Sequence, residues 1–132
     1  MKNISIYKSL GAFAVLAIAL LPLNQVRAEI TTRMVLGALP VAGFQYYAGK
    51  RNWDNLKVGD PLTLVRDTNN PHDANAIRIE WQGEMLGFVP RAGNISVAKL
   101  MDKGAKVSGR IVNLHPGRSH WQRIMFEIVW DE

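Results

Sequence analysis

The sequence predicts a mainly β domain with one or two short helices, folded as a small and partly closed antiparallel barrel. Roughly five or six short runs of β-prone residues are joined mostly by short turns. A single stretch, residues 95–103, has the apolar spacing and the end signals of a clear helix. A flat sandwich would need more strands, so we expect a curved barrel of the OB-like or SH3-like kind.

The first element in the chain has the features of a cleavable signal peptide. Lys2 and Lys8 supply a positive start, residues 10–21 form an uncharged apolar run, and residues 26–28 are a typical cleavage site. As a helix, this run would span only about 18 Å, which is short of the roughly 30 Å hydrocarbon core of a membrane. We therefore expect a signal that is removed, and no stable membrane anchor afterwards.

Cleavage after Ala28 would separate a signal peptide, residues 1–28, from a single periplasmic or secreted domain, residues 29–132. It would lower the formal net charge from +5 to +2, because the signal carries three basic and no acidic residues. So small a charge gives little long-range attraction for nucleic acid. The absence of Cys from the sequence excludes disulfides and thiolate metal sites.

The expected strands begin at residue 32. Residues 32–43 are apolar but interrupted by Gly37 and Pro40, which favours an edge or bulged strand. Residues 61–66 and 76–81 alternate between apolar and polar positions, as half-buried strands do.

A hairpin, the helix and a second hairpin are expected next. Residues 85–89 follow a tight Gln-Gly turn and are predicted to pair with the preceding strand. Asn94 is expected to cap the start of the helix, and Gly104 to end it. Residues 106–114 and 121–130 are two further strands, joined by a loop rich in His, Pro and Gly.

Polar side chains concentrate in the loop of residues 67–75. Asn and Asp bond their own backbone and Pro71 fixes φ, so we expect a rigid loop that holds its polar groups outward. Such a density fits a binding rim, and equally well a tightly hydrogen-bonded loop. The outward side chains are expected to be those of Asn69, Asn70, His72, Asp73 and Asn75.

Aromatic and basic residues are interleaved in a second segment, residues 44–53. A single-stranded nucleic acid needs such a mixture, because bases stack on rings while cations meet phosphates. The alternative is that two of the rings belong to the core. The residues concerned are Phe44, Tyr46, Tyr47, Lys50, Arg51 and Trp53.

The sequence contains no recognisable catalytic motif: it has no phosphate-binding loop, nucleophile elbow or metalloprotease helix. The best zinc candidate is His72 with Asp67 and Asp73, joined across space by His115 or His120. Spacing alone does not show that these residues converge, and a carboxylate pair for hydrolysis is equally unspecific. We therefore expect neither a cofactor nor catalysis.

Three segments taken in order, VAGFQYYAG, LTLVRDTNNPHDANAIRI and MLGFVPR, resemble a HIRAN domain. The resemblance covers a core of residues 41–130, and the block NNPxDxNAI makes it specific. HIRAN domains occur in helicase-like DNA-repair proteins and as small stand-alone bacterial proteins, and this chain resembles the latter in an exported form. The resemblance implies an OB-like barrel with a cleft that captures the 3′ end of single-stranded DNA.

The same resemblance implies roles for individual residues. Tyr46 and Tyr47 would stack on or pack beside the terminal bases. Asn70 and Asp73 would hydrogen-bond the terminal nucleotide, and Arg91 would meet a phosphate. An acidic acceptor favours a free hydroxyl over a terminal phosphate, which it would repel.

Three positions depart from the DNA-binding members of the family. Gln45 stands in place of an Arg, His72 in place of a Tyr, and Phe88 in place of a His beside the cleft. The loss of the Arg removes a phosphate contact worth about one unit of salt slope. Zinc binding and acid-anhydride hydrolysis, which are sometimes attached to the family, belong to fused helicase and RING modules and are not expected here.

Two hypotheses from different classes follow. The first is a module that binds single-stranded DNA at its 3′ end, without catalysis. The second is a periplasmic adaptor that uses the barrel to bind a peptide, a glycan or an envelope protein, which Gln45 and the low charge of the mature chain favour. Binding of DNA that depends on the chemistry of its end separates them.

Overall fold

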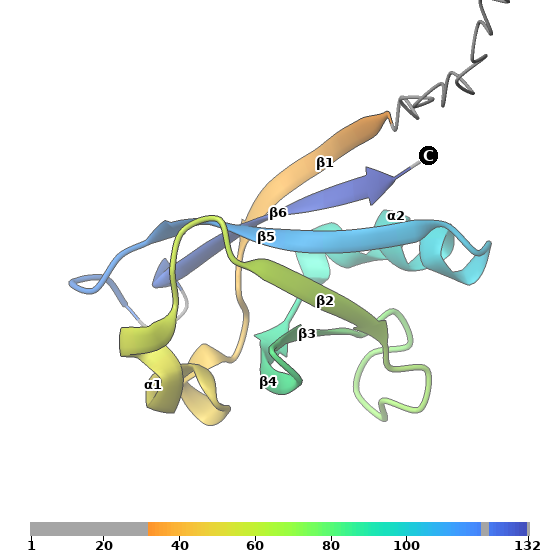
Figure 1. Cartoon of the computed structure of the whole chain (residues 1–132). Coiled ribbons are helices and arrows are strands. Elements are labelled where there is room, and N and C mark those ends of the chain that lie inside the picture. Colours follow the sequence, from red (N-terminus) through yellow and green to blue (C-terminus); the bar gives the residue numbers. More distant parts are fainter. Residues whose placement is uncertain (1–31, 120–121, 132) are drawn as a thin grey trace, which may run out of the picture.

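The structure is a computed structural model that describes residues 32–119 and 122–131. Six strands form one antiparallel sheet in the order β1-β6-β5-β2-β3-β4 (Figure 1). The strands are β1 (Arg33–Pro40), β2 (Pro61–Arg66), β3 (Ile77–Trp81), β4 (Glu84–Phe88), β5 (Lys106–Leu114) and β6 (Ile124–Asp131). The predicted signal peptide lies outside the described residues. Within them, no helix is long and apolar enough to cross a membrane.

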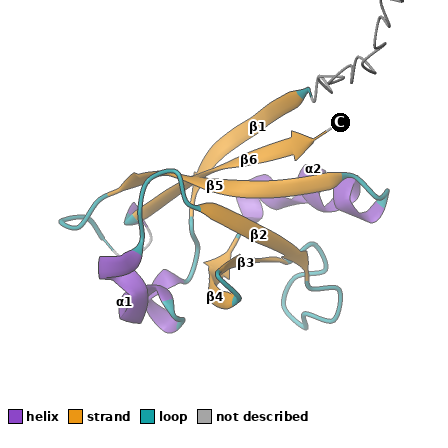
Figure 2. Cartoon of the chain, viewed as in Figure 1, coloured by secondary structure: helices purple, strands orange, loops and turns teal. Residues whose placement is uncertain are grey.

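The helices are short and lie at two places (Figure 2). Between β1 and β2, the chain forms η1 (Phe44–Tyr46), α1 (Gly49–Asn52) and η2 (Trp53–Asn55). Between β4 and β5, it forms α2 (Arg91–Asp102), which packs against β5. The fold class predicted from the sequence, a mainly β barrel with short helices, is therefore confirmed.

Strand β1 is an edge strand with a bulge, as the sequence predicts. It pairs only with β6, and the register shifts between Val35 and Gly37. Its first four residues are exposed, and Met34 and Val35 keep 47% and 56% of their surface. The apolar side chains in the first half of this strand therefore lie outside the core, whereas Leu39 in its second half packs against the core.

The core is built from the alternating positions of the strands. In β3, every second residue is buried, so Ile77, Ile79 and Trp81 face inward while the charged residues between them are half-buried. β2 and β6 alternate in the same way, and α2 adds Val97 and Ala98. Each large apolar side chain buried in this manner contributes about 1.5–3 kcal/mol.

A single bridge between Ala42 and Phe88 closes the barrel, and we call it the barrel seam. Just after β1, the Val41 N–H still donates to β6, at 2.9 Å from the Ile124 carbonyl. The next residue turns to the opposite edge of the sheet, where Ala42 and Phe88 exchange two hydrogen bonds, both 2.9 Å long. One step along the backbone thus joins the two ends of the sheet.

Gly87 makes this approach possible. A Cβ atom at this position would overlap the carbonyl oxygen of Ala42 and lie 2.8 Å from a side-chain carbon of Val41. Its φ of 155° is also one that other residues rarely adopt. The barrel seam therefore requires glycine here.

The predicted start of the main helix is wrong. Helix α2 begins at Arg91 directly after Pro90, three residues before Asn94, which was expected to be its cap. Pro90 has φ −57° and ψ 144°, and proline is well suited to the start of a helix. Asn94 lies within the helix and is buried. The predicted end is confirmed, with Gly104 at φ 89°.

Substitution of Gly87 should open the barrel seam. Gly87→Ala should lower the free energy of unfolding by about 2–3 kcal/mol, because the new methyl group collides with backbone at a strained φ. Gly37→Ala is the control, since a Cβ there meets nothing within 4 Å, and it should cost less than about 1 kcal/mol. Urea unfolding of both variants checks this, and equal losses would contradict it.

Candidate nucleic-acid interface

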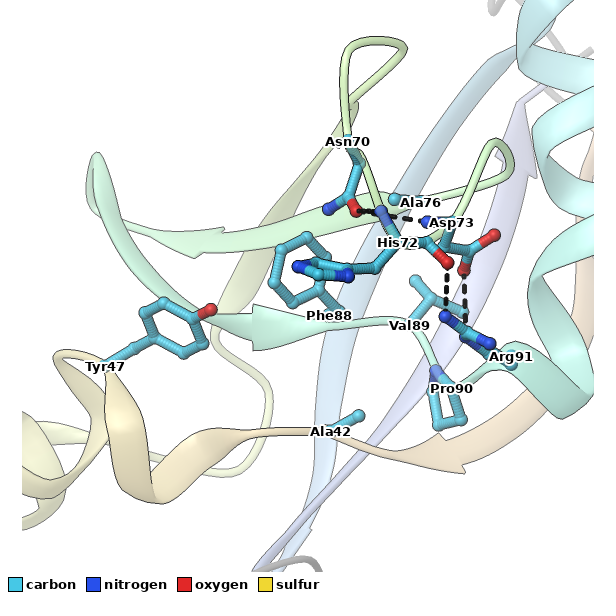
Figure 3. Close-up of a pocket in the computed structure, with 10 residues that line it drawn as sticks. All are labelled: Ala42, Tyr47, Asn70, His72, Asp73, Ala76, Phe88, Val89, Pro90 and Arg91. Carbon is cyan, nitrogen blue, oxygen red and sulfur yellow. Dashed lines mark hydrogen bonds and ion pairs between the residues drawn. The ribbon is translucent and has the colours of Figure 1, made fainter.

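A pocket of about 300 Å³ opens at the barrel seam (Figure 3). It is bordered by the chain after β1, by the end of β4 and the start of α2, and by the polar loop of residues 67–75. Residues far apart in the sequence therefore line one pocket. Those that line it are Ala42, Tyr47, Asn70, His72, Asp73, Ala76, Phe88, Val89, Pro90 and Arg91.

Six of the eight residues predicted for binding line this pocket, and two do not. Gln45 and Tyr46 lie outside it. The side-chain oxygen of Gln45 is buried without a hydrogen-bond partner, and Tyr46 is 78% exposed. The six that meet are Tyr47, Asn70, His72, Asp73, Phe88 and Arg91.

Aromatic rings form one side of the pocket. Tyr47 and Phe88 pack edge to face, with ring centroids 5.9 Å apart and planes at 73°. The alternative prediction, that some of these rings belong to the core, is confirmed for Phe44, which is fully buried and packs edge to face with the partly buried Trp53. The aromatic segment is therefore divided between the core and the pocket.

Asn70 uses its side chain to shape the loop. Its Oδ1 accepts the backbone N–H groups of His72 at 2.9 Å and Asp73 at 3.1 Å. Its Nδ2 donates to Asp67 at 3.2 Å. For this residue the reading as a tightly hydrogen-bonded loop is confirmed, and one Nδ2 hydrogen remains to meet a ligand.

Asp73 is held as an ionised acceptor at the edge of the pocket. Its Oδ1 accepts the Asn75 N–H at 2.9 Å, and its Oδ2 accepts the Asn94 side chain at 2.7 Å. The hydrogen bond from Asn75 is the main cause that lowers the pKa of Asp73, and Asn94, Arg91 and Arg66 lower it further against partial desolvation. The carboxylate therefore keeps its charge at neutral pH.

Arg91 brings a cation to the pocket from the first position of α2. Its guanidinium donates to the His72 carbonyl and lies 3.7 Å from an oxygen of Asp73. The side chain is 72% exposed. An arginine has five N–H donors, so donors remain for an anion.

Arg66, at the end of β2, holds the loop of residues 67–75 in place, and no local sequence signal predicted this role. It donates to the carbonyls of Ala76 at 2.7 Å and Ala74 at 3.1 Å, and it pairs with Asp102 of α2 at 2.9 Å. Its side chain is only 14% exposed. The loop and the end of α2 are therefore fixed to one another through this residue.

Within the described part of the chain, the proposed zinc ligands do not form a cluster. Across residues 32–119 and 122–131, no three His, Asp or Glu side chains lie close enough to hold a metal ion. His120 lies outside the described residues. Asp73 and Asp67 instead accept hydrogen bonds from asparagine side chains.

Comparison with known families agrees with this geometry. Residues 36–131, which span almost all of the described chain, match the HIRAN domain. The chain belongs to the HIRAN domain family. All the residues that line the pocket lie inside the matched range.

Relatives of this HIRAN domain support the assignment. The mouse helicase-like transcription factor is 37% identical over 71 residues, which are 52% of this chain and 7% of that much longer protein. A crystal structure of a Lactobacillus plantarum protein superposes with a TM-score of 0.67 at 27% identity, covering 77% of this chain and 98% of that one. The HIRAN domain of human HLTF has the same fold, with a TM-score of 0.57 at 22% identity over 74% of this chain and 78% of that chain.

Three carboxylates of this HIRAN domain link its stability to pH. The pKa values of Asp73, Glu84 and Asp102 are lowered mainly by hydrogen bonds, from the Asn75 backbone, the Asn52 side chain and Arg66 respectively. Because the folded pKa lies below the unfolded one, the stabilisation is fully present above the unfolded pKa. It is lost as the pH falls through the folded value.

We expect stability to fall between about pH 5 and pH 2, and Asp102→Asn to reduce this dependence. The variant should be less stable than the wild type at pH 7, and the difference should narrow in acid. The control is Asp54→Asn, at an exposed position of η2, whose free energy of unfolding should change with pH in parallel with that of the wild type. Urea unfolding at a series of pH values checks this, and a difference that stays constant down to pH 2 would contradict it.

Proposed function

We propose that this HIRAN domain binds single-stranded DNA at a free 3′ end in the pocket at the barrel seam, without catalysis of its own. The observation that carries the proposal is the position of Asp73. This ionised acceptor lies between an aromatic wall and the Arg91 cation. A terminal nucleotide carries the matching groups, which are a base, a hydroxyl donor and a phosphate.

The aromatic wall supports stacking of a base. Phe88 meets the Tyr47 ring edge to face, and Tyr47 remains 38% exposed. Base–aromatic stacking contributes about 1–3 kcal/mol per base and tolerates any sequence. The volume of about 300 Å³ is at the small end for ligand pockets, and suits one terminal nucleotide better than several.

The polar side supports a choice between ends. A 3′ hydroxyl can donate a charge-assisted hydrogen bond to Asp73, whereas a 3′ phosphate would bring its own negative charge against the carboxylate. Arg91 and the N-terminus of α2 face the pocket together. Both favour the phosphate that precedes the terminal nucleoside.

The mouse relative supports nucleic acid as the ligand class, since its name describes a helicase-like transcription factor. If residues 1–28 are an export signal, the DNA would be extracellular or entering the cell. This role does not require a broad positively charged surface. A single held end requires only local contacts.

A second candidate is an adaptor for a peptide or another envelope component. The observation that favours it is Gln45, which is neutral and so offers no cation to a phosphate, and whose side-chain oxygen is buried. Among the described residues that line the pocket, Arg91 is the one Arg or Lys. Failure of the DNA experiment below would make this candidate the better one.

The purified protein should bind short single-stranded DNA with a free 3′ hydroxyl at least about tenfold more tightly than the same DNA with a 3′ phosphate. Fluorescence anisotropy at two salt concentrations measures both affinities. The salt slope should be small, about one to two, because few cations line the pocket. Binding that ignores the end and disappears with salt would contradict end recognition.

Variants should separate stacking from end recognition. Tyr47→Ala should weaken the binding of both DNAs about 5- to 100-fold, because the terminal base of each loses the ring on which it stacks. Asp73→Asn keeps an acceptor but removes the charge, so it should abolish the preference for the hydroxyl. Lys106→Ala on β5, away from the pocket, is the control and should change neither affinity by more than about twofold. Equal effects of all three would place the site elsewhere.

A further inference from the structure

We infer that Asn94 is a positioning residue of this pocket, which fixes the Asp73 carboxylate in place and so determines which terminal groups the pocket accepts. The ligand in this statement rests on the proposed function. The positioning itself can be tested without any ligand. The role is distinct from the cap at the start of the helix that the sequence predicted for this residue.

Asn94 is a buried polar residue in an otherwise apolar setting. It is 1% exposed, and its Nδ2 lies 2.7 Å from Oδ2 of Asp73. No other polar or charged residue is as buried within the described segments. Its neighbours Val97 and Ala98 are buried on the same helix, so an apolar residue would suit the packing. Burial of an amide is unfavourable unless it is hydrogen-bonded.

The helix itself gains nothing from this side chain. α2 begins at Arg91 after Pro90 and has no side-chain cap hydrogen bond. Asparagine inside a helix is less favourable than most residues, because its amide competes with the backbone. Burial and helix propensity therefore both disfavour Asn94, and its hydrogen bond to Asp73 is what offsets them.

Asn94 donates a hydrogen bond to Asp73 and Arg91 forms an ion pair with it, and these two side chains differ in mobility. Arg91 is 72% exposed and 3.7 Å away, so it can turn toward the phosphate of a ligand. Asn94 is enclosed by the core and cannot follow. It is also neutral, so it orients the carboxylate without cancelling its charge. When Arg91 engages a ligand, Asn94 and the Asn75 N–H still hold the carboxylate, whose remaining lone pairs can accept a donor.

Removal of Asn94 should leave the loop folded, because α2 holds it at a second point. Arg66 connects Asp102, eight positions further along the helix, to the carbonyls of Ala74 and Ala76. This attachment lies about 12 Å along the axis from Asn94. A variant at Asn94 therefore loosens one carboxylate and leaves the loop attached.

The first test is the titration of Asp73, followed by carboxyl NMR in the full chain without ligand. In Asn94→Leu and in the smaller Asn94→Ala, the pKa of Asp73 should rise, because a donor to the ionised form is lost. Ser96→Ala, at an exposed position of the same helix, should leave it unchanged. If Asn94→Leu does not fold, Asn94→Ala carries the test. An unchanged pKa in a folded variant overturns the positioning role.

The second test is the preference between DNA ends. The ratio of the dissociation constants for 3′-phosphate and 3′-hydroxyl DNA should fall at least fivefold in Asn94→Leu. In an Asp73→Asn background, the same substitution should have no further effect, because Asn94 acts through Asp73. An equal fall in both backgrounds overturns the inference. If the wild type binds neither DNA, the proposed function fails, while the titration still decides whether Asn94 positions Asp73.

Discussion

Two hydrogen bonds between Ala42 and Phe88 close this barrel, and the pocket depends on them. The bridge brings the segment that carries Tyr47 against the strand that carries Phe88, and a further hydrogen bond of 3.0 Å from the Ala48 N–H to the Met85 carbonyl helps to hold the two rings together. Gly87 allows the backbones to approach. The wall of the pocket and the closure of the fold are therefore one structural feature in this chain.

The polar side of the pocket follows a different physical logic. The loop of residues 67–75 has no strand partner, so its asparagine and aspartate side chains supply the hydrogen bonds that a sheet would otherwise provide. α2 then fixes the loop through Asp102 near its end and Asn94 near its start. A site on a loop gains the rigidity of a helix in this way, and the proposed binding of a small terminal group would require that rigidity.

The sequence predicted most of the fold, because strand alternation and turn residues are local signals. Six of the residues that the family motif indicated lie together in one pocket, although the sequence contained no information on the distances between them. It missed contacts between distant positions: Arg66 and Asp102 are 36 residues apart, and no pattern links them. Asn94 was misread because a helix cap and a buried donor use the same side chain. Gln45 and Tyr46 lie in a 3₁₀ turn, where consecutive side chains point in different directions, so adjacency to Tyr47 did not place them in the pocket.

The pairing of β1 with β6 has a consequence for how the domain folds. Arg33 lies opposite Asp131, so β1, the first described strand, can pair with the sheet only after β6, the last strand, has formed. Contacts between such distant positions carry a large loop-closure cost and form slowly, whereas hairpins such as β3–β4 form within microseconds. Ala42 reaches Phe88 from the end of β1. We therefore expect the binding pocket to be among the last features to assemble, after the loop that lines it is already in place.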